Sequence, residues 1–161
     1  MPNLHIFSGS ILDTPSKTLL ISIGENGVLK GATARTMAER FGSELQEAVL
    51  ASGPFEKCDA RLFPRDGYNL IFGRPFDYDI KLLTIFGIEW VVKSALTICD
   101  ERLFPDIAIS ALTANYLPDS DGQINDIIHL AIQTYFEKHT DSWIKDIYLV
   151  NYIKDIFQTK I

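Results

Sequence analysis

The sequence contains little cysteine, and this argues against two kinds of structure. Cys58 and Cys99 are its only cysteines among 161 residues, and neither lies near a pair of histidines. A disulfide framework needs several cysteines, and a zinc site needs cysteine and histidine ligands at short spacings. We therefore expect no disulfide and no metal site, and nothing else in the sequence indicates a cofactor. Both cysteines are interpreted as buried thiols.

Long apolar stretches are also missing. Nowhere do about 18 apolar residues follow one another, which is the length that a membrane-spanning helix needs. The first residues, from Met1 to His5, carry no basic stretch followed by an apolar run, so a secretion signal is not indicated. We expect a protein of the cytoplasm with no membrane partner.

Positive charge is scarce and scattered. The chain has 15 Lys and Arg residues against 21 Asp and Glu residues, which gives a formal net charge of −6. Such a surface repels a nucleic-acid backbone, so generic DNA or RNA binding is disfavoured. A small anionic ligand stays open, because backbone N–H groups at the start of a helix bind phosphate without a basic side chain.

Apolar residues are plentiful enough for one core. They make up 47% of the chain, and charged residues make up 22%. A chain of this length is too short for two cores of ordinary size. We therefore expect a single domain over residues 1–161.

The hydrophobic pattern alternates between strands and helices. Apolar, β-branched runs predict strands at residues 4–7, 18–23, 60–63, 69–72, 107–111 and 143–152. Apolar stripes at helical spacing predict helices at residues 32–50, 79–103 and 123–138, with Trp90 on the buried face of the second. Gly42 and Ser43 indicate a break in the first helix, and Asp66-Gly67 indicates a hairpin. This order predicts an α/β fold with helices on both faces of a mixed sheet.

One glycine-rich loop follows a strand that is apolar on both faces. It runs from Gly24 to Gly31, and a helix begins near Ala32. In open α/β sheets, ligands bind outside the carboxyl ends of the strands, where strand turns into helix. Glycines permit close approach of the backbone, and the helix start offers free N–H groups with partial positive charge. The loop therefore predicts an anion-binding site.

At this loop the sequence resembles the macro-domain family. The resemblance covers residues 19–41, with Asn26-Gly27-Val28-Leu29-Lys30-Gly31-Ala32 as its core. Upstream, Gly9-Ser10-Ile11 stands where that family has Gly-Asp-Ile, and residues 107–116 stand where it has an apolar strand and a second phosphate loop. The resemblance implies a three-layer α/β/α macro-domain-like fold with a mixed central sheet.

The same resemblance implies a pocket for ADP-ribose or a related nucleotide, either free or attached to a macromolecule. Adenine would lie near Ser10 and Ile11, the diphosphate between the two loops, and the distal ribose near Asn26. The implied ligand-binding residues are Gly9, Ser10, Ile11, Asn26, Gly27, Val28, Leu29, Lys30, Gly31, Ala32, Thr113, Ala114, Asn115 and Tyr116.

Three departures from the family pattern keep other functions open. Ser10 is neutral where the family has an aspartate, and the second loop carries side chains in place of glycines. The lysine that helps related hydrolases is absent from residues 69–76, and Arg74 stays charged and cannot act as a base. One alternative is an ADP-ribosylhydrolase whose water is oriented by Asn26 or Glu25. The other is a degenerate macro fold that acts as a protein-interaction subunit.

Several of these residues also have a simpler interpretation. Asn26 can be a turn residue whose side chain caps its own backbone, and Lys30 can be a solvated loop lysine. Tyr116 can cover a ligand or only the edge of the core. The sequence leaves these alternatives open.

Overall fold

A computed structural model describes residues 1–24, 26–75, 81–110, 112 and 121–152. The strands are β1 (Asn3–Phe7), β2 (Thr18–Ser22), β3 (Ala60–Arg65), β4 (Tyr68–Gly73), β5 (Asp106–Ile109) and β6 (Asp146–Val150). The helices are α1 (Ala32–Phe41), α2 (Ser43–Ala51), α3 (Lys81–Arg102) and α4 (Asp121–Lys138), with a short 3-10 helix η1 (Ile11–Asp13) after β1.

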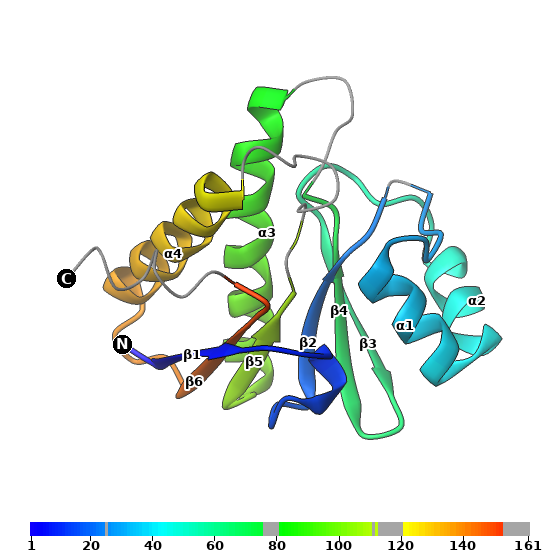
Figure 1. Cartoon of the computed structure of the whole chain (residues 1–161), viewed down its shortest axis with the longest axis horizontal. Helices are drawn as coiled ribbons and strands as arrows, with labels where there is room; N and C mark the ends of the chain where they lie inside the picture. Colours follow the sequence, from blue (N-terminus) through cyan, green and yellow to red (C-terminus); the bar gives the residue numbers. More distant parts are fainter. Residues whose placement is uncertain (25, 76–80, 111, 113–120, 153–161) are drawn as a thin grey trace.

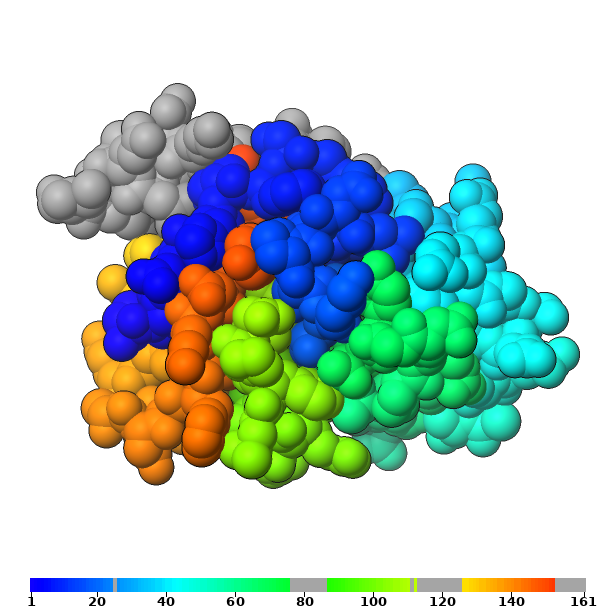
Figure 2. Space-filling model, turned by 90° about the horizontal axis from the view of Figure 1, so that it is seen from below, coloured from blue at the N-terminus to red at the C-terminus, as the bar shows by residue number. Residues whose placement is uncertain are grey.

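The six strands form one mixed sheet in the order β1-β6-β5-β2-β4-β3. All neighbouring pairs are parallel except β3 and β4, which form an antiparallel hairpin at one edge. The first and last strands of the chain lie next to each other, with Asn3 opposite Asp146 and Phe7 opposite Val150. Figure 2 shows this pairing as the blue N-terminal segment against orange β6, with β5 beside it.

Helices cover both faces of the sheet, so the fold has three layers (Figure 1). Leu20, Ile71 and Ile109 point to the face where α3 and α4 pack. Their neighbours Leu19 and Leu70 point to the opposite face, toward α1 and α2. Because β2 has apolar partners on both sides, its sequence shows no polar alternation, and the predicted α/β/α architecture with a mixed sheet is confirmed.

Two local predictions rest on backbone conformation, and both are confirmed. Gly42 has φ +79° and separates α1 from α2, so the stripe predicted over residues 32–50 belongs to two helices. Asp66 and Gly67 have φ +48° and +83°, which are the left-handed conformations of a two-residue hairpin turn. The hairpin strands are longer than predicted because β3 continues to Arg65 and β4 begins at Tyr68.

Some details of the sequence prediction are wrong. Trp90 is 57% exposed, whereas Val91, predicted on the same face, is buried together with Ile88 and Ala95. The helix packs against both the sheet and α4, so its buried face is turned by one residue from the predicted stripe. Strand β6 begins at Asp146, and Trp143 precedes it with 57% exposure. Cys99 is buried as predicted, whereas Cys58 is half-buried.

Among the described residues, no helix is both long and apolar enough to cross a bilayer. Within the same ranges, no group of three or more His, Cys, Asp or Glu residues is placed to hold a metal ion.

Candidate functional site: a cleft at the carboxyl edge of the sheet

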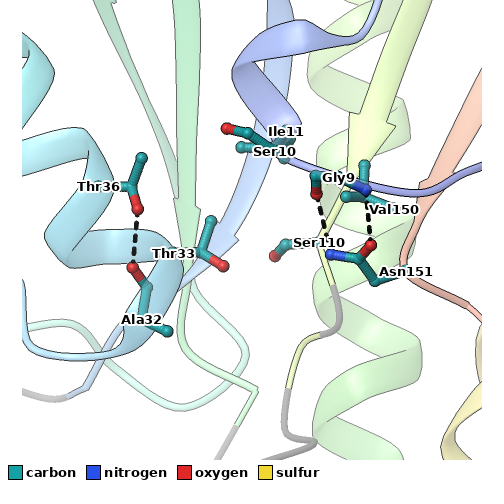
Figure 3. Close-up of a pocket in the computed structure, with 9 residues that line it drawn as sticks. All are labelled: Gly9, Ser10, Ile11, Ala32, Thr33, Thr36, Ser110, Val150 and Asn151. Carbon is teal, nitrogen blue, oxygen red and sulfur yellow. Dashed lines mark hydrogen bonds between the residues drawn. The ribbon is translucent and has the colours of Figure 1, made fainter.

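A cleft of about 230 Å³ lies where the parallel strands end. It is bounded by the segments that follow β1, β5 and β6 and by the first turns of α1. The nine lining residues in Figure 3 are Gly9, Ser10, Ile11, Ala32, Thr33, Thr36, Ser110, Val150 and Asn151. In open α/β sheets this edge is where ligands bind, because the strand-to-helix turns leave backbone groups exposed there.

One wall of the cleft is the beginning of α1. Its N-cap is Gly31, which has no side chain and therefore gives the helix no capping hydrogen bond. The first N–H groups of an α-helix have no partner within the helix and carry partial positive charge. Ala32 and Thr33 bring this helix start to the cleft, and the Thr36 hydroxyl donates to the Ala32 carbonyl over 3.0 Å. This wall is therefore suited to an anion.

The opposite wall joins the end of β1 to the end of β6. The carboxamide of Asn151 accepts a hydrogen bond from the Gly9 N–H (2.9 Å) and donates one to the Gly9 carbonyl (3.0 Å). We call this pair of bonds the Asn151 clamp. Next to it, the Ser10 hydroxyl oxygen accepts the Leu12 N–H over 3.3 Å and caps η1. Ile11 is buried behind them.

Ser110 contributes to the cleft from the end of β5 and is only 3% exposed. Its backbone N–H and its hydroxyl both donate to the Leu20 carbonyl, over 3.1 and 2.9 Å. The Tyr152 hydroxyl donates to the Ser110 carbonyl over 3.0 Å, and burial raises the pKa of Tyr152. These contacts fix Ser110 between two strands and a buried tyrosine.

The described lining of the cleft is electrically neutral. Its polar side chains are three hydroxyl-bearing residues from α1 and the β1 loop, the hydroxyl of Ser110, and the carboxamide of Asn151. Ile11 and Val150 add apolar surface. A ligand here would meet hydroxyls, backbone amides and two aliphatic side chains, a mixture that fits a sugar or a flat heterocycle better than an isolated ion.

The glycine-rich loop is tied to α2 and not turned into the cleft. The Gln46 side chain accepts the Leu29 N–H over 2.9 Å and donates to the Gly27 carbonyl over 2.8 Å. Gly27 has φ +74°, and a Cβ there would lie 3.3 Å from Val49, so the turn requires glycine. The Asn26 carboxamide oxygen accepts the Val28 N–H over 3.1 Å. Asn26 is therefore a turn residue whose side chain caps the backbone, which is the simpler of the two interpretations given above.

The structure brings together some of the predicted site residues. Gly9, Ser10, Ile11 and Ala32 line the cleft, whereas Asn26, Gly27, Val28, Leu29, Lys30 and Gly31 do not. Lys30 is exposed to solvent. Thr113, Ala114, Asn115, Tyr116 and Glu25 lie outside the described residues. The ligand-binding role of all these residues stays a prediction.

Five lining residues were not found from the sequence. Thr33 and Thr36 follow Ala32 on α1, and their helical spacing could have indicated that they share its face. Ser110 lies in the run assigned to a strand and the second loop. Val150 and Asn151 were taken as part of a strand over 143–152, and nothing local shows that Asn151 turns back to Gly9, 142 residues away.

Comparison by sequence finds nothing: no protein-family model and no curated protein matches the chain. Comparison of structures, in contrast, finds clear matches. A mutant macrodomain from Oceanobacillus iheyensis with ADPR superposes with a TM-score of 0.83 at 12% identity, over 99% of this chain and 91% of that one. The macro domain of ganglioside induced differentiation associated protein 2 gives 0.81 at 11% identity, over 99% and 85%.

A third match is the Trypanosoma brucei macrodomain in complex with ADP-ribose. It superposes with a TM-score of 0.76 at 11% identity, over 97% of this chain and 66% of that one. All three superpositions span nearly the whole of the present chain at very low identity. The chain therefore has the macrodomain fold, in a strongly diverged form.

Proposed function

We propose that the protein is a macro-domain module that recognises ADP-ribose or a related nucleotide, free or as an ADP-ribosyl modification of a macromolecule. The observation that carries this proposal is the cleft between the uncapped start of α1 and the ends of β5, β6 and β1. Support comes from the Trypanosoma brucei macrodomain of the same fold, which was solved in complex with ADP and in complex with ADP-ribose.

The residues of the cleft suggest how such a ligand would be held. The N–H groups of the first turn of α1 would donate to the diphosphate, since no side chain competes for them. The hydroxyls of Thr33 and Ser10 would serve ribose oxygens or the edge of the base, and Ile11 and Val150 would pack on the base. This mode needs no basic side chain and therefore agrees with the acidic composition.

Catalysis has less support than binding. The carboxamide oxygen of Asn26 accepts the Val28 N–H, and the Arg74 guanidinium donates to the Phe55 carbonyl over 2.7 Å. Within the described part of the chain, no carboxylate or imidazole lines the cleft to activate a water molecule. We therefore place the hydrolase below the binding module.

The protein-interaction alternative is favoured by one specific observation. The N–H groups of Val28 and Leu29 are bonded within the protein, so they are not offered to a phosphate. A protein-interaction subunit that no longer binds a nucleotide would keep the fold, and the N–H groups of its glycine-rich loop would be bonded within the protein, as they are here. The two functions differ in whether ADP-ribose binds at all.

Calorimetric titration and thermal shift with ADP-ribose test the proposal. We expect measurable heat and a rise in melting temperature at about 1 mM ligand, since saturation at 100 times Kd adds roughly 2.7 kcal/mol of stability. ADP and ribose 5-phosphate, titrated separately, show which part of the ligand contributes. Absence of heat and of a thermal shift with all three ligands would contradict the proposal and favour the protein-interaction role.

A pair of variants locates the binding. Thr33→Tyr fills the cleft with an aromatic ring and is expected to abolish ADP-ribose binding. Gln133→Tyr places the same ring at an exposed position of α4, which contributes no residue to the lining of this cleft, and should bind as the natural protein does. Equal binding by both variants would show that the ligand uses another surface.

A further inference from the structure

Asn151 makes three hydrogen bonds that join the end of β6 to the end of β1 and the segment after it. Its N–H donates to the Phe7 carbonyl over 2.7 Å, continuing the β1–β6 ladder by one residue. Its carboxamide then forms the Asn151 clamp on the N–H and carbonyl of Gly9, as the dashed lines in Figure 3 show. Asn151 has φ +60°, a left-handed conformation that asparagine adopts more readily than most residues.

The clamp holds Gly9, whereas Ser10 is held by its own bonds from the N–H groups of Leu12 and Asp13. Ser8, Gly9 and Ser10 are all exposed, and they connect the end of β1 to η1. Gly9 has φ +130°, a region that residues with a side chain rarely adopt. The clamp pairs both backbone groups of Gly9 in this unusual conformation, and Ser10 and Ile11 follow directly into the wall of the cleft.

We propose that Asn151 is a positioning residue of the cleft, which acts through Gly9 to keep the Gly9-Ser10-Ile11 wall in the geometry that the ligand meets. The effect on affinity rests on the proposed function, whereas the effect on the wall does not. Without the clamp, the segment would sample several conformations, and a ligand would have to order it on binding. Asn151 is thus important for binding without having to touch the ligand.

This role has a signature that a purely structural role lacks. Hydrogen bonds at an exposed site compete with water, so their removal changes global stability little. The ordering cost, in contrast, falls entirely on the binding step. Removing the clamp should therefore weaken the ligand affinity much more than it lowers the melting temperature.

The test compares variants at the two ends of β6. Asn151→Gly removes the clamp and keeps the left-handed backbone accessible. Ser142→Ala is the matched control, because the Ser142 hydroxyl also makes two hydrogen bonds, to Asp100 and from Ile144, before β6 begins. Calorimetry with ADP-ribose at a temperature where both variants are folded should give about ten-fold weaker binding for Asn151→Gly and unchanged binding for Ser142→Ala.

Amide hydrogen exchange provides a readout that needs no ligand. In Asn151→Gly, exchange of the Gly9 N–H should become at least about ten-fold faster, because the donor loses its acceptor. The Ser110 N–H, which donates to Leu20, should keep its rate. If Asn151→Gly fails to fold, Gly9→Ala attacks the same clamp from the other side, by forcing a Cβ onto φ +130°.

The outcomes separate the two proposals. If the natural protein binds no ADP-ribose but the Gly9 exchange accelerates in the variant, the proposed function fails and the clamp stands. If the natural protein binds and Asn151→Gly binds equally well, the positioning role is overturned. It is also overturned if the Gly9 exchange rate does not change.

Discussion

Gly87 lies inside α3, where the backbone of Pro75 packs directly against the helix. A Cβ on Gly87 would overlap the Pro75 carbonyl oxygen and lie 2.9 Å from its carbonyl carbon. The neighbouring strand has the same feature, because a Cβ on Gly73 would overlap the side chain of buried Val91. In both places glycine is required by the close approach of another element and not by its own φ.

Gly87→Ala should therefore reverse the usual effect of this substitution. At a solvent-exposed position inside a helix, replacing glycine by alanine stabilises the folded protein by about 1 kcal/mol. Here the added methyl group must displace backbone, and we expect a loss of about 2 kcal/mol or more. Urea unfolding measures it, with Gln133→Ala on the exposed side of α4 as the control that should stay within about 0.5 kcal/mol. An increase in stability would show that Pro75 moves aside at no cost.

These residues also show which features cannot be predicted from the sequence, namely contacts between residues that are far apart in it. In the sequence, Gly87 only indicates a weak point inside a helix, and its contact partner is a loop residue that no local pattern identifies. Asn26 and Gln46 show the same limit, since the bridge from Gln46 to Gly27 and Leu29 joins residues that only the folded chain brings together. Gly9 to Ile11 line the cleft after a strand that apolar spacing predicted, but only the resemblance to macro domains had indicated them as site residues.

Arg61 links the end of α2 to the beginning of β3. Its guanidinium donates to the Asp59 carboxylate (2.8 Å) and to the carbonyl oxygens of Ser52, Gly53 and Pro54, which follow α2. The same group lies 4.2 Å above the ring of Phe55. One planar group thus satisfies a whole connecting turn, which lysine could not do with a single ammonium.

Arg61→Lys keeps the charge and loses the fork of donors. We expect the free energy of unfolding to fall by about 1–3 kcal/mol, because several carbonyl groups lose their partner. Arg65→Lys is the matched control on the same strand, where the arginine donates to the Pro64 carbonyl. Denaturant unfolding of the two variants decides the matter, and equal stabilities would mean that water replaces Arg61 without cost.

At the level of helices and strands, the sequence predicted most of what is observed. The six strands and the break at Gly42 were accessible because apolar spacing and glycine act locally. The rotation of α3 about its axis could not be predicted from the sequence, because it depends on how α4 and the sheet both pack against this helix. Trp90 was therefore placed on the wrong side.

The molecule as a whole should be sensitive to alkaline conditions. Burial raises the pKa of the Cys99 thiol and of the Tyr152 hydroxyl. Burial and the hydrogen bond to Asp100 do the same for Tyr135. Each group keeps its proton in the folded chain after the unfolded chain has released it. The stability is complete below the unfolded pKa, and it decreases as the pH rises past about 8.5 for cysteine and about 10 for tyrosine.

Tyr135→Phe tests this directly. Above about pH 10, each retained proton makes the free energy of unfolding fall by roughly 1.4 kcal/mol per pH unit. The variant removes one such group, so its stability should decline less steeply there, although it starts lower for want of the bond to Asp100. Urea unfolding between pH 8 and 11 gives both curves, and parallel curves above pH 10 would contradict the assignment.

The pairing of β1 with β6 decides when the cleft can exist. Its wall needs Gly9 and Asn151 in contact, and these two residues are 142 positions apart in the chain. A nascent chain can assemble the β3–β4 hairpin and α1 early, but β1 must wait with an unsatisfied edge until the ribosome has delivered residues 146–151. The cleft can therefore form only after residue 151 has been synthesised, and polypeptides released before β6 would lack it altogether.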